Sequence, residues 1–144
     1  MLVVEFFEIA EDLEKVKLPL YNCSISAGFP SPADDYIDLK LDLNEYLIKR
    51  PSSTFLVRVS GESMIKAGIH DGDLLTVDRS ITPTDGKIVI AVINGECTVK
   101  RIRYKNNILH LLPENDAFAP IIIKEFSDTV FIWGVVTNVI HPLL

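Results

Sequence analysis

From Pro51 onward the chain is a series of short apolar runs separated by polar turns. The runs are rich in valine, isoleucine, leucine and aromatic residues, which is typical of β-strands. Glycine, asparagine, aspartate and proline dominate the turns HDGD, TPTDG, NGE and KNN. In INGECTV the pair Asn94-Gly95 stands between two runs, a strong signal for a two-residue hairpin. The pattern predicts an all-β barrel or sandwich from TFLVRVS, DLLTVDR, KIVIAVIN, ECTVKRIRY, NILHLLPE and TVFIWGVVTNVI.

Ahead of Pro51 the spacing of apolar residues changes. In DLNEYLIKR the apolar side chains recur at helical spacing and fall on one face. Asp42 stands at the cap position, and Glu45 follows three residues later, which is the spacing of a capping box. Since a residue before proline disfavours the helical region, the stretch predicts one short helix that ends before Pro51.

Residues 1–40 lack a comparable pattern. The stretch SAGFPSPADDY holds Gly28, Pro30 and Pro32, which interrupt regular structure. We therefore expect residues 1–40 to form an extended arm with a short strand or helical turn. Residues 41–144 are expected to form the β-rich domain.

Composition limits the classes of protein to which this chain can belong. With 144 residues, of which 48% are hydrophobic, the chain can bury one real core. Its formal net charge of -6 disfavours direct binding to DNA, because neutralising phosphates requires clustered lysine and arginine. The charge leaves two kinds of function open, binding to other proteins and chemistry on peptides.

The cysteines and the N-terminus indicate the compartment. Cys23 and Cys97 lie far apart, with no CxxC pair and no local His/Cys cluster, so the sequence predicts neither a zinc site nor a disulfide. The apolar start of the chain lacks a basic leading segment, and Glu5 and Glu8 interrupt it, so it is no secretory signal. No apolar run is long enough to span a membrane. A reducing cytoplasm is expected.

The stretch SGESMIKAGIHDGD offers candidate chemistry. Ser63 lies in a strand-to-turn segment, where most serines only form turns, and a nucleophile would need a base. None of His70, His110 and His141 comes with a motif that marks a catalytic triad. The acidic side chains of this region suggest a metal by charge, but HDGD is more economically a turn before a strand. The aspartates concerned are Asp71, Asp73 and Asp78.

A lysine is the other candidate base. In ECTVKRIRYK, taken as a strand, side chains alternate between two faces. Lys100 falls between Thr98 and Ile102 on one face. Three of the four residues on the other face are cations: Arg101, Arg103 and Lys105, beside Val99. Lys100 either extends its amine to the edge or is partly buried with a lowered pKa. A neutral lysine amine can take the proton of a serine hydroxyl.

Several motifs together resemble a known family. SGESM, then GIHDGDLLTVD, GKIVIAVINGECTVKRI, LLPENDAFAPI and a closing WGVV are similar to the LexA/UmuD family of self-cleaving Ser-Lys peptidases. The resemblance implies a β-rich, LexA-like and signal-peptidase-like catalytic domain. It further implies that Ser63 is the nucleophile and Lys100 the general base. Met64 is expected to pack below the nucleophile, and Glu62 has no assigned role.

The resemblance also suggests where the chain is cut. In this family the bond joins a small residue to glycine ahead of the catalytic domain, and Ala27-Gly28 in SISAGFPSP matches. From the residues alone AGFPSP is a linker. Only 27 residues precede the bond, too few for the three-helix DNA-binding domain of LexA-type repressors. The chain therefore looks like the UmuD branch, the accessory subunits of error-prone DNA polymerases.

The resemblance implies partners that composition does not show. They are a second copy in a homodimer, a RecA filament on single-stranded DNA that stimulates cleavage, and a UmuC-type DNA polymerase. From the residues themselves we expect no cofactor, no metal, no membrane contact and no sequence-specific DNA contact. Two other classes stay open, a dimeric binding module without catalysis and a signal-peptidase-like enzyme that cuts other proteins.

Overall fold

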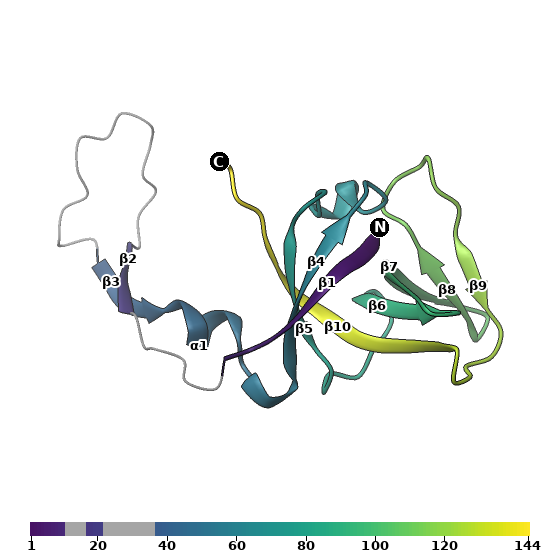
Figure 1. Ribbon diagram of the computed structural model, residues 1–144, viewed down its shortest axis with the longest axis horizontal. Helices are drawn as coiled ribbons and strands as arrows, with labels where there is room; N and C mark the ends of the chain where they lie inside the picture. The colour runs from purple at the N-terminus through teal and green to yellow at the C-terminus, as the bar shows by residue number, and fades with distance from the viewer. Residues whose placement is uncertain (11–16, 22–36) are drawn as a thin grey trace. The chain divides into compact units, whose positions relative to one another are not determined.

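The computed structural model describes residues 1–10, 17–21 and 37–144. They divide into two compact units, each described by itself. One unit joins Met1–Ile9 to Arg50–Leu144, and the other is Ala10–Lys49 (Figure 1). The first nine residues of the predicted arm therefore pack with the β-rich part of the chain. The proposed boundary at residue 40 stays a prediction.

The larger unit is built on one antiparallel sheet. Its strand order is β1-β4-β5-β10-β6-β7-β8-β9, and β1 also pairs with β7, where Leu2 lies opposite Thr98. This added pairing joins six strands into a closed ring, and β8 and β9 extend the sheet beyond it. The bounds are β1 (Leu2–Glu8), β4 (Thr54–Ser60), β5 (Leu74–Asp78), β6 (Ile88–Ile93), β7 (Glu96–Lys105), β8 (Ile108–Leu112), β9 (Ile121–Ile123) and β10 (Val130–Ile140).

All six predicted runs form strands, which confirms the prediction of a mainly β protein. The strands bury two groups of apolar side chains. The first group lies inside the ring and includes Val57, Leu75 and Ile90. The second includes Ile102, Leu109 and Leu111, where β7 and β8 pack beside β6 and β10. Sequence patterns missed β9, which has only three residues.

Two hairpins show how the turns set the register. Asn94 and Gly95 both have positive φ angles, 50° and 85°, between paired residues of β6 and β7. Positive φ at both central positions is the type I′ geometry, whose twist matches that of the strands it joins. Asn106 and Asn107 make the corresponding turn between β7 and β8, with φ angles of 52° and 63°. The hairpin predicted at Asn94-Gly95 is therefore confirmed.

The smaller unit contains β2 (Lys17–Tyr21), β3 (Ile37–Asp42) and α1 (Leu43–Leu47). β2 and β3 pair antiparallel, with Leu18 opposite Leu41. The predicted helix is present, and the Asp42 side chain caps it by accepting from the Asn44 N–H at 3.0 Å. It ends at Leu47, before Pro51, as predicted. Among the described helices, none has the length and hydropathy needed to cross a membrane.

Ile90 and Ile122 provide a matched test of which side chains stabilise the fold by burial. Ile90 is fully buried in the first core group, whereas the side chain of Ile122 in β9 is 56% exposed. Ile90→Ala is expected to lower the free energy of unfolding by about 2–5 kcal/mol, because it leaves a cavity. Ile122→Ala should cost less than about 1 kcal/mol. Urea unfolding measures both, and equal losses would contradict this placement of the core.

Candidate functional site

Ser63 lies in the turn that follows β4. Gly61 adopts a φ of 97°, which bends the chain sharply inward at the end of the strand. The Gly61 N–H is held by the Asp71 carboxylate at 2.8 Å. Ser63 and Met64 behind it are both fully buried, and Met64 belongs to the first core group. Within SGESM, Gly61 and Glu62 are exposed to solvent, whereas Ser63 and Met64 turn into the core.

A distant segment braces this turn through its backbone. The Glu114 N–H donates to the Ser63 carbonyl at 2.8 Å, and the Lys66 N–H donates to the Glu114 carbonyl at 2.9 Å. The Asn115 side chain donates to the Glu62 carbonyl at 2.8 Å. Sequence reasoning gave Asn115 no role, although PENDAF was among the motifs of the resemblance. The turn that carries Ser63 is therefore fixed by residues some fifty positions later.

Lys100 lies on β7, opposite Val89 of β6. It is only 7% exposed, and its amine donates to the Thr98 hydroxyl at 2.9 Å and the Val99 carbonyl at 3.3 Å. The alternative in which the amine reaches the sheet edge is thus wrong. Burial lowers the pKa of Lys100, while a hydrogen bond with the amine of Met1 raises it. Val99 is also fully buried, so its face is not uniformly wet.

Met1 joins the two predicted catalytic residues. Its amine donates to the Ser63 hydroxyl and interacts with the Lys100 side chain. Its carbonyl accepts from the Val99 N–H at 3.1 Å and from the Thr98 hydroxyl at 2.9 Å. Burial, reinforced by the charge of Lys100, lowers the pKa of the Met1 amine from 8.0 to about 6. The start of β1 thus occupies the space beside both Ser63 and Lys100.

The rest of β1 is held by its neighbours in the ring. β1 pairs with β4 from Leu2, opposite Ser60, to Glu8, opposite Phe55. Val3 packs against the first core group, and Phe6 meets Trp133 edge-on, with ring centroids 5.2 Å apart. Other apolar side chains of this strand point outward: Leu2, Val4 and Phe7 are 38–54% exposed. The apolar start of the chain therefore covers the domain with one face only.

The other sequence candidates lie elsewhere or serve the turns. Ala27 and Gly28 fall outside the described residues. The nearest partner of His110 is the Ile108 carbonyl, 3.0 Å away, while His70 and His141 both meet Asp73. Asp78 takes hydrogen bonds from Arg50, Ser53 and Ser80. Three histidines that are separate in the sequence are thus accounted for by contacts away from Ser63.

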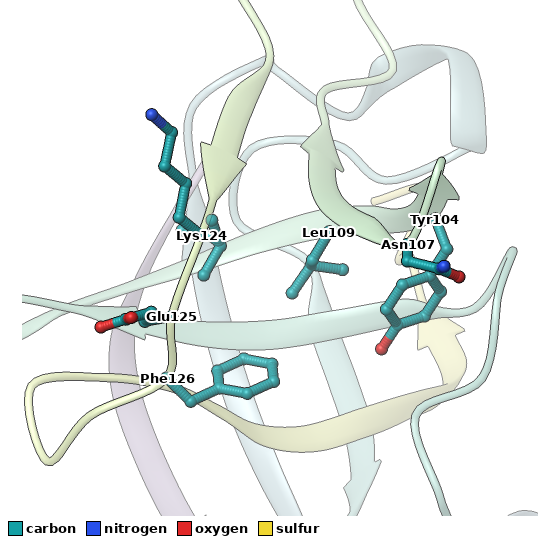
Figure 2. A pocket seen from close by; sticks show the side chains of 7 residues that line it. Tyr104, Asn107, Leu109, Lys124, Glu125 and Phe126 are labelled. Atoms are coloured by element: carbon teal, nitrogen blue, oxygen red, sulfur yellow. The ribbon is translucent and has the colours of Figure 1, made fainter.

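A small hollow lies at the other end of the sheet, among β7, β8, β9 and the segment after β9 (Figure 2). Its volume is about 110 Å³, below the range of roughly 300–1,000 Å³ typical of ligand pockets. It includes neither Ser63 nor Lys100, and is lined by Tyr104, Asn107, Leu109, Ile123, Lys124, Glu125 and Phe126. We assign it no part in the candidate chemistry.

Comparison with known proteins identifies the family. Residues 19–137 match the family described as Peptidase S24-like. Protein MucA of Salmonella typhimurium is 44% identical over 97% of both chains. Protein ImpA of Salmonella typhimurium is 50% identical over 85% of this chain and 83% of its own. The LexA repressor of Pectobacterium carotovorum is 40% identical over 89% of this chain and 62% of its own. The chain therefore belongs to the peptidase S24-like family, whose members are serine peptidases.

Proposed function

We propose that this protein is a UmuD-like peptidase of the SOS response that cleaves its own Ala27-Gly28 bond with a Ser63-Lys100 dyad. The observation that carries the proposal is the meeting of two buried side chains, Ser63 and Lys100, around the amine of Met1. A serine and a lysine with a lowered pKa are the parts that a Ser-Lys peptidase needs. The matches to MucA, ImpA and LexA support the same function.

The chemistry follows from the state of Lys100. As a neutral amine it accepts the proton of the Ser63 hydroxyl while the oxygen attacks the carbonyl carbon of Ala27. Backbone N–H groups of the Ser63 turn stabilise the oxyanion. The ammonium of Lys100 then protonates the nitrogen of Gly28 as the peptide bond breaks. Water hydrolyses the remaining ester, which frees the carboxyl group of Ala27 and restores Ser63.

The residues at the bond suit a confined site. Ala27 requires only a small pocket, and Gly28 has no side chain to obstruct the approach of the Ser63 hydroxyl. Met1 occupies the space beside that hydroxyl in the structure, so the scissile bond must displace it. A site that is filled most of the time slows the reaction by the fraction of molecules in which it is free. The docked start of β1 should therefore slow cleavage of the isolated protein.

The partners follow from the family resemblance and from the surface. We propose that a RecA filament on single-stranded DNA stimulates cleavage, and that the shortened product is a homodimer that joins a UmuC-type error-prone DNA polymerase in the cytoplasm. The net charge of -6 disfavours direct DNA binding. The outward apolar face of β1 suits contact with another protein, since side chains of this kind mark interaction surfaces. Residues 1–40 serve as the arm and residues 41–144 as the catalytic and dimerisation domain.

One observation favours a second candidate, a binding subunit without catalysis. Met1 fills the space beside Ser63, which a permanent structural role would also explain. The two candidates differ in whether purified protein ever yields a fragment that begins at Gly28. The three tests below separate them.

Replacing either member of the dyad is expected to abolish self-cleavage. Ser63→Ala removes the nucleophile and Lys100→Ala removes the base, so each should lower the rate more than about 1,000-fold. Mass spectrometry detects the fragments 1–27 and 28–144 after incubation with a RecA filament. Matched controls are the exposed residues Ser52 and Lys105, whose alanine variants should cleave normally. A fragment from Ser63→Ala that starts at Gly28 would exclude Ser63 as the nucleophile.

The pH profile of cleavage tests both Lys100 and Met1. Only neutral Lys100 is a base, so the rate should rise with pH, by about one log unit per pH unit below its pKa. Docking of Met1 opposes this rise. Its amine has a pKa of about 6 when docked and 8.0 when free, so docking releases a proton and strengthens as the pH rises through this window. We therefore expect a shallow profile from about pH 6 to 8 and a steeper one above.

Fragment yield measured at a series of pH values between about 6 and 10 provides this profile. A rate that falls throughout the range would contradict Lys100 as the base. A rise of one log unit in the rate per pH unit from pH 6 upward would agree with Lys100 as the base but contradict Met1 as the group that must be displaced.

Two valines in β1 test whether the strand restrains cleavage. Val3 packs on the core, whereas Val4 sits at a bulge and is 54% exposed. Val3→Ala should weaken docking by about 1 kcal/mol and so raise the cleavage rate up to about fivefold. Val4→Ala, the same chemical change on the outer side, should leave the rate nearly unchanged. Equal rates for the two variants and the unaltered chain would show that β1 does not need to leave.

A further inference from the structure

Two histidines and an aspartate that are distant in the sequence meet at one end of the sheet. His70 and Asp73 lie in the turn before β5, and His141 directly follows β10. β5 and β10 lie side by side (Figure 1), and Ile140 pairs with Leu74 in their ladder. His141, the next residue, is thereby held beside Asp73. One potential ligand atom from each of the three residues lies within 4.8 Å of the others. The cluster is separate from the contacts of Ser63 and Lys100.

The cluster has a buried floor and an open side. The Asp73 side chain is 1% exposed, while those of His70 and His141 are 50% and 41% exposed. The Nδ1 atom of His141 contacts one oxygen of Asp73, and that of His70 lies 3.6 Å from the other. The two imidazole rings lie 4.5 Å apart at an angle of 34°. Both rings thus direct the same nitrogen toward one buried carboxylate.

We propose that His70, Asp73 and His141 bind Zn²⁺, through the two Nδ1 atoms and one carboxylate oxygen. Two imidazoles and a carboxylate are a common donor set for zinc, which is usually four-coordinate with bonds of about 2.0–2.2 Å. Such bonds place ligand atoms roughly 3.3 Å apart, so His70 and Asp73 are already near the required spacing. A water molecule completes the tetrahedron from the solvent side, where both histidines are exposed.

The surroundings favour a bound ion over a simple ion pair. Ion pairing to Asp73 needs only one imidazole, yet the structure aims two at it. The Asp73 carboxylate is buried, and a divalent ion held between the two rings compensates its negative charge. Mg²⁺ and Ca²⁺ prefer all-oxygen sites, so the two nitrogens select a transition ion.

The backbone holds the buried ligand in place before any ion arrives. Asp73 donates its N–H to the His70 carbonyl at 3.1 Å, and its own carbonyl accepts from the Val59 N–H at 3.1 Å. The Asp73 carboxylate also accepts from the His70 N–H at 2.8 Å. His141 lies in the segment after β10, which forms no strand, so its ring can move away from Asp73 to the distance that a shared ion requires. The site thus combines one fixed ligand with two adjustable ones.

The test is a titration of the full chain, stripped of metal with a chelator, by Zn²⁺ in a calorimeter. We expect one ion per chain, and no binding of Mg²⁺ at the same concentrations. Co²⁺ in place of Zn²⁺ should give the visible absorption of a tetrahedral site. Saturation at about 100 times the dissociation constant should raise Tm by roughly 5–10 °C. All three ligands lie after the Ala27-Gly28 bond, so cleavage of the chain leaves the site complete.

Histidine variants decide whether this cluster is the site. His70→Ala and His141→Ala should each weaken Zn²⁺ binding at least about 100-fold and remove the Co²⁺ spectrum. His110→Ala is the matched control, because His110 lies on β8 away from the cluster, and it should bind as the unaltered chain does. Melting in the presence of chelator verifies that each variant is folded. Absence of Zn²⁺ binding, or binding that survives in both His70→Ala and His141→Ala, would overturn the proposal.

Discussion

The placement of one amine, that of Lys100, underlies the rest of the larger unit. An ammonium group inside a β-sheet is costly unless it finds partners, and here those partners are a hydroxyl and a carbonyl of its own strand. β1 closes the ring of six strands between β4 and β7, and Met1, just ahead of β1, lies against the Lys100 side chain. Closure and chemistry are therefore connected, since the strand that completes the barrel-like ring also brings Met1 against Ser63 and Lys100. Under the proposed function, this strand must therefore loosen before the site can act on the Ala27-Gly28 bond.

Local patterns were sufficient for most of the fold. Alternating apolar residues and two-residue turns determine strands almost independently of their partners, as the hairpin at Asn94-Gly95 shows. Lys100 was recognisable because it interrupts the alternation of charged residues along β7. The resemblance identified Ser63, whose burial in a polar, glycine-containing turn is not visible from composition. The helix was placed correctly and ends before Pro51 as predicted, and its last backbone hydrogen bond runs from the Ile48 N–H to the Asn44 carbonyl.

The features that sequence patterns missed all depend on pairing between distant segments. Nothing in the first eight residues indicates that they would add to the edge of β4 and reach β7. The cluster of His70, Asp73 and His141 was not expected because only local spacing was considered, whereas Asp73 and His141 are 68 positions apart and meet through the β5–β10 ladder. Asn115 likewise gains its role only when its segment folds over the Ser63 turn. Such contacts are set by register across a sheet, which a single sequence does not reveal.

The brace on the Ser63 turn has a consequence for the order of events during synthesis. Ribosomes produce a chain from its N-terminus, so the proposed Ala27-Gly28 bond emerges long before Glu114 and Asn115, which hold the turn through Ser63 and Glu62. Lys100 also follows the bond by many residues. The proposed nucleophile, Ser63, is therefore not organised while the nascent arm is most exposed, so the proposed self-cleavage has to wait until nearly all of the chain has been made. The delay requires no inhibitor. It follows from the length of chain between the proposed bond and Glu114 and Asn115, which hold the Ser63 turn in place.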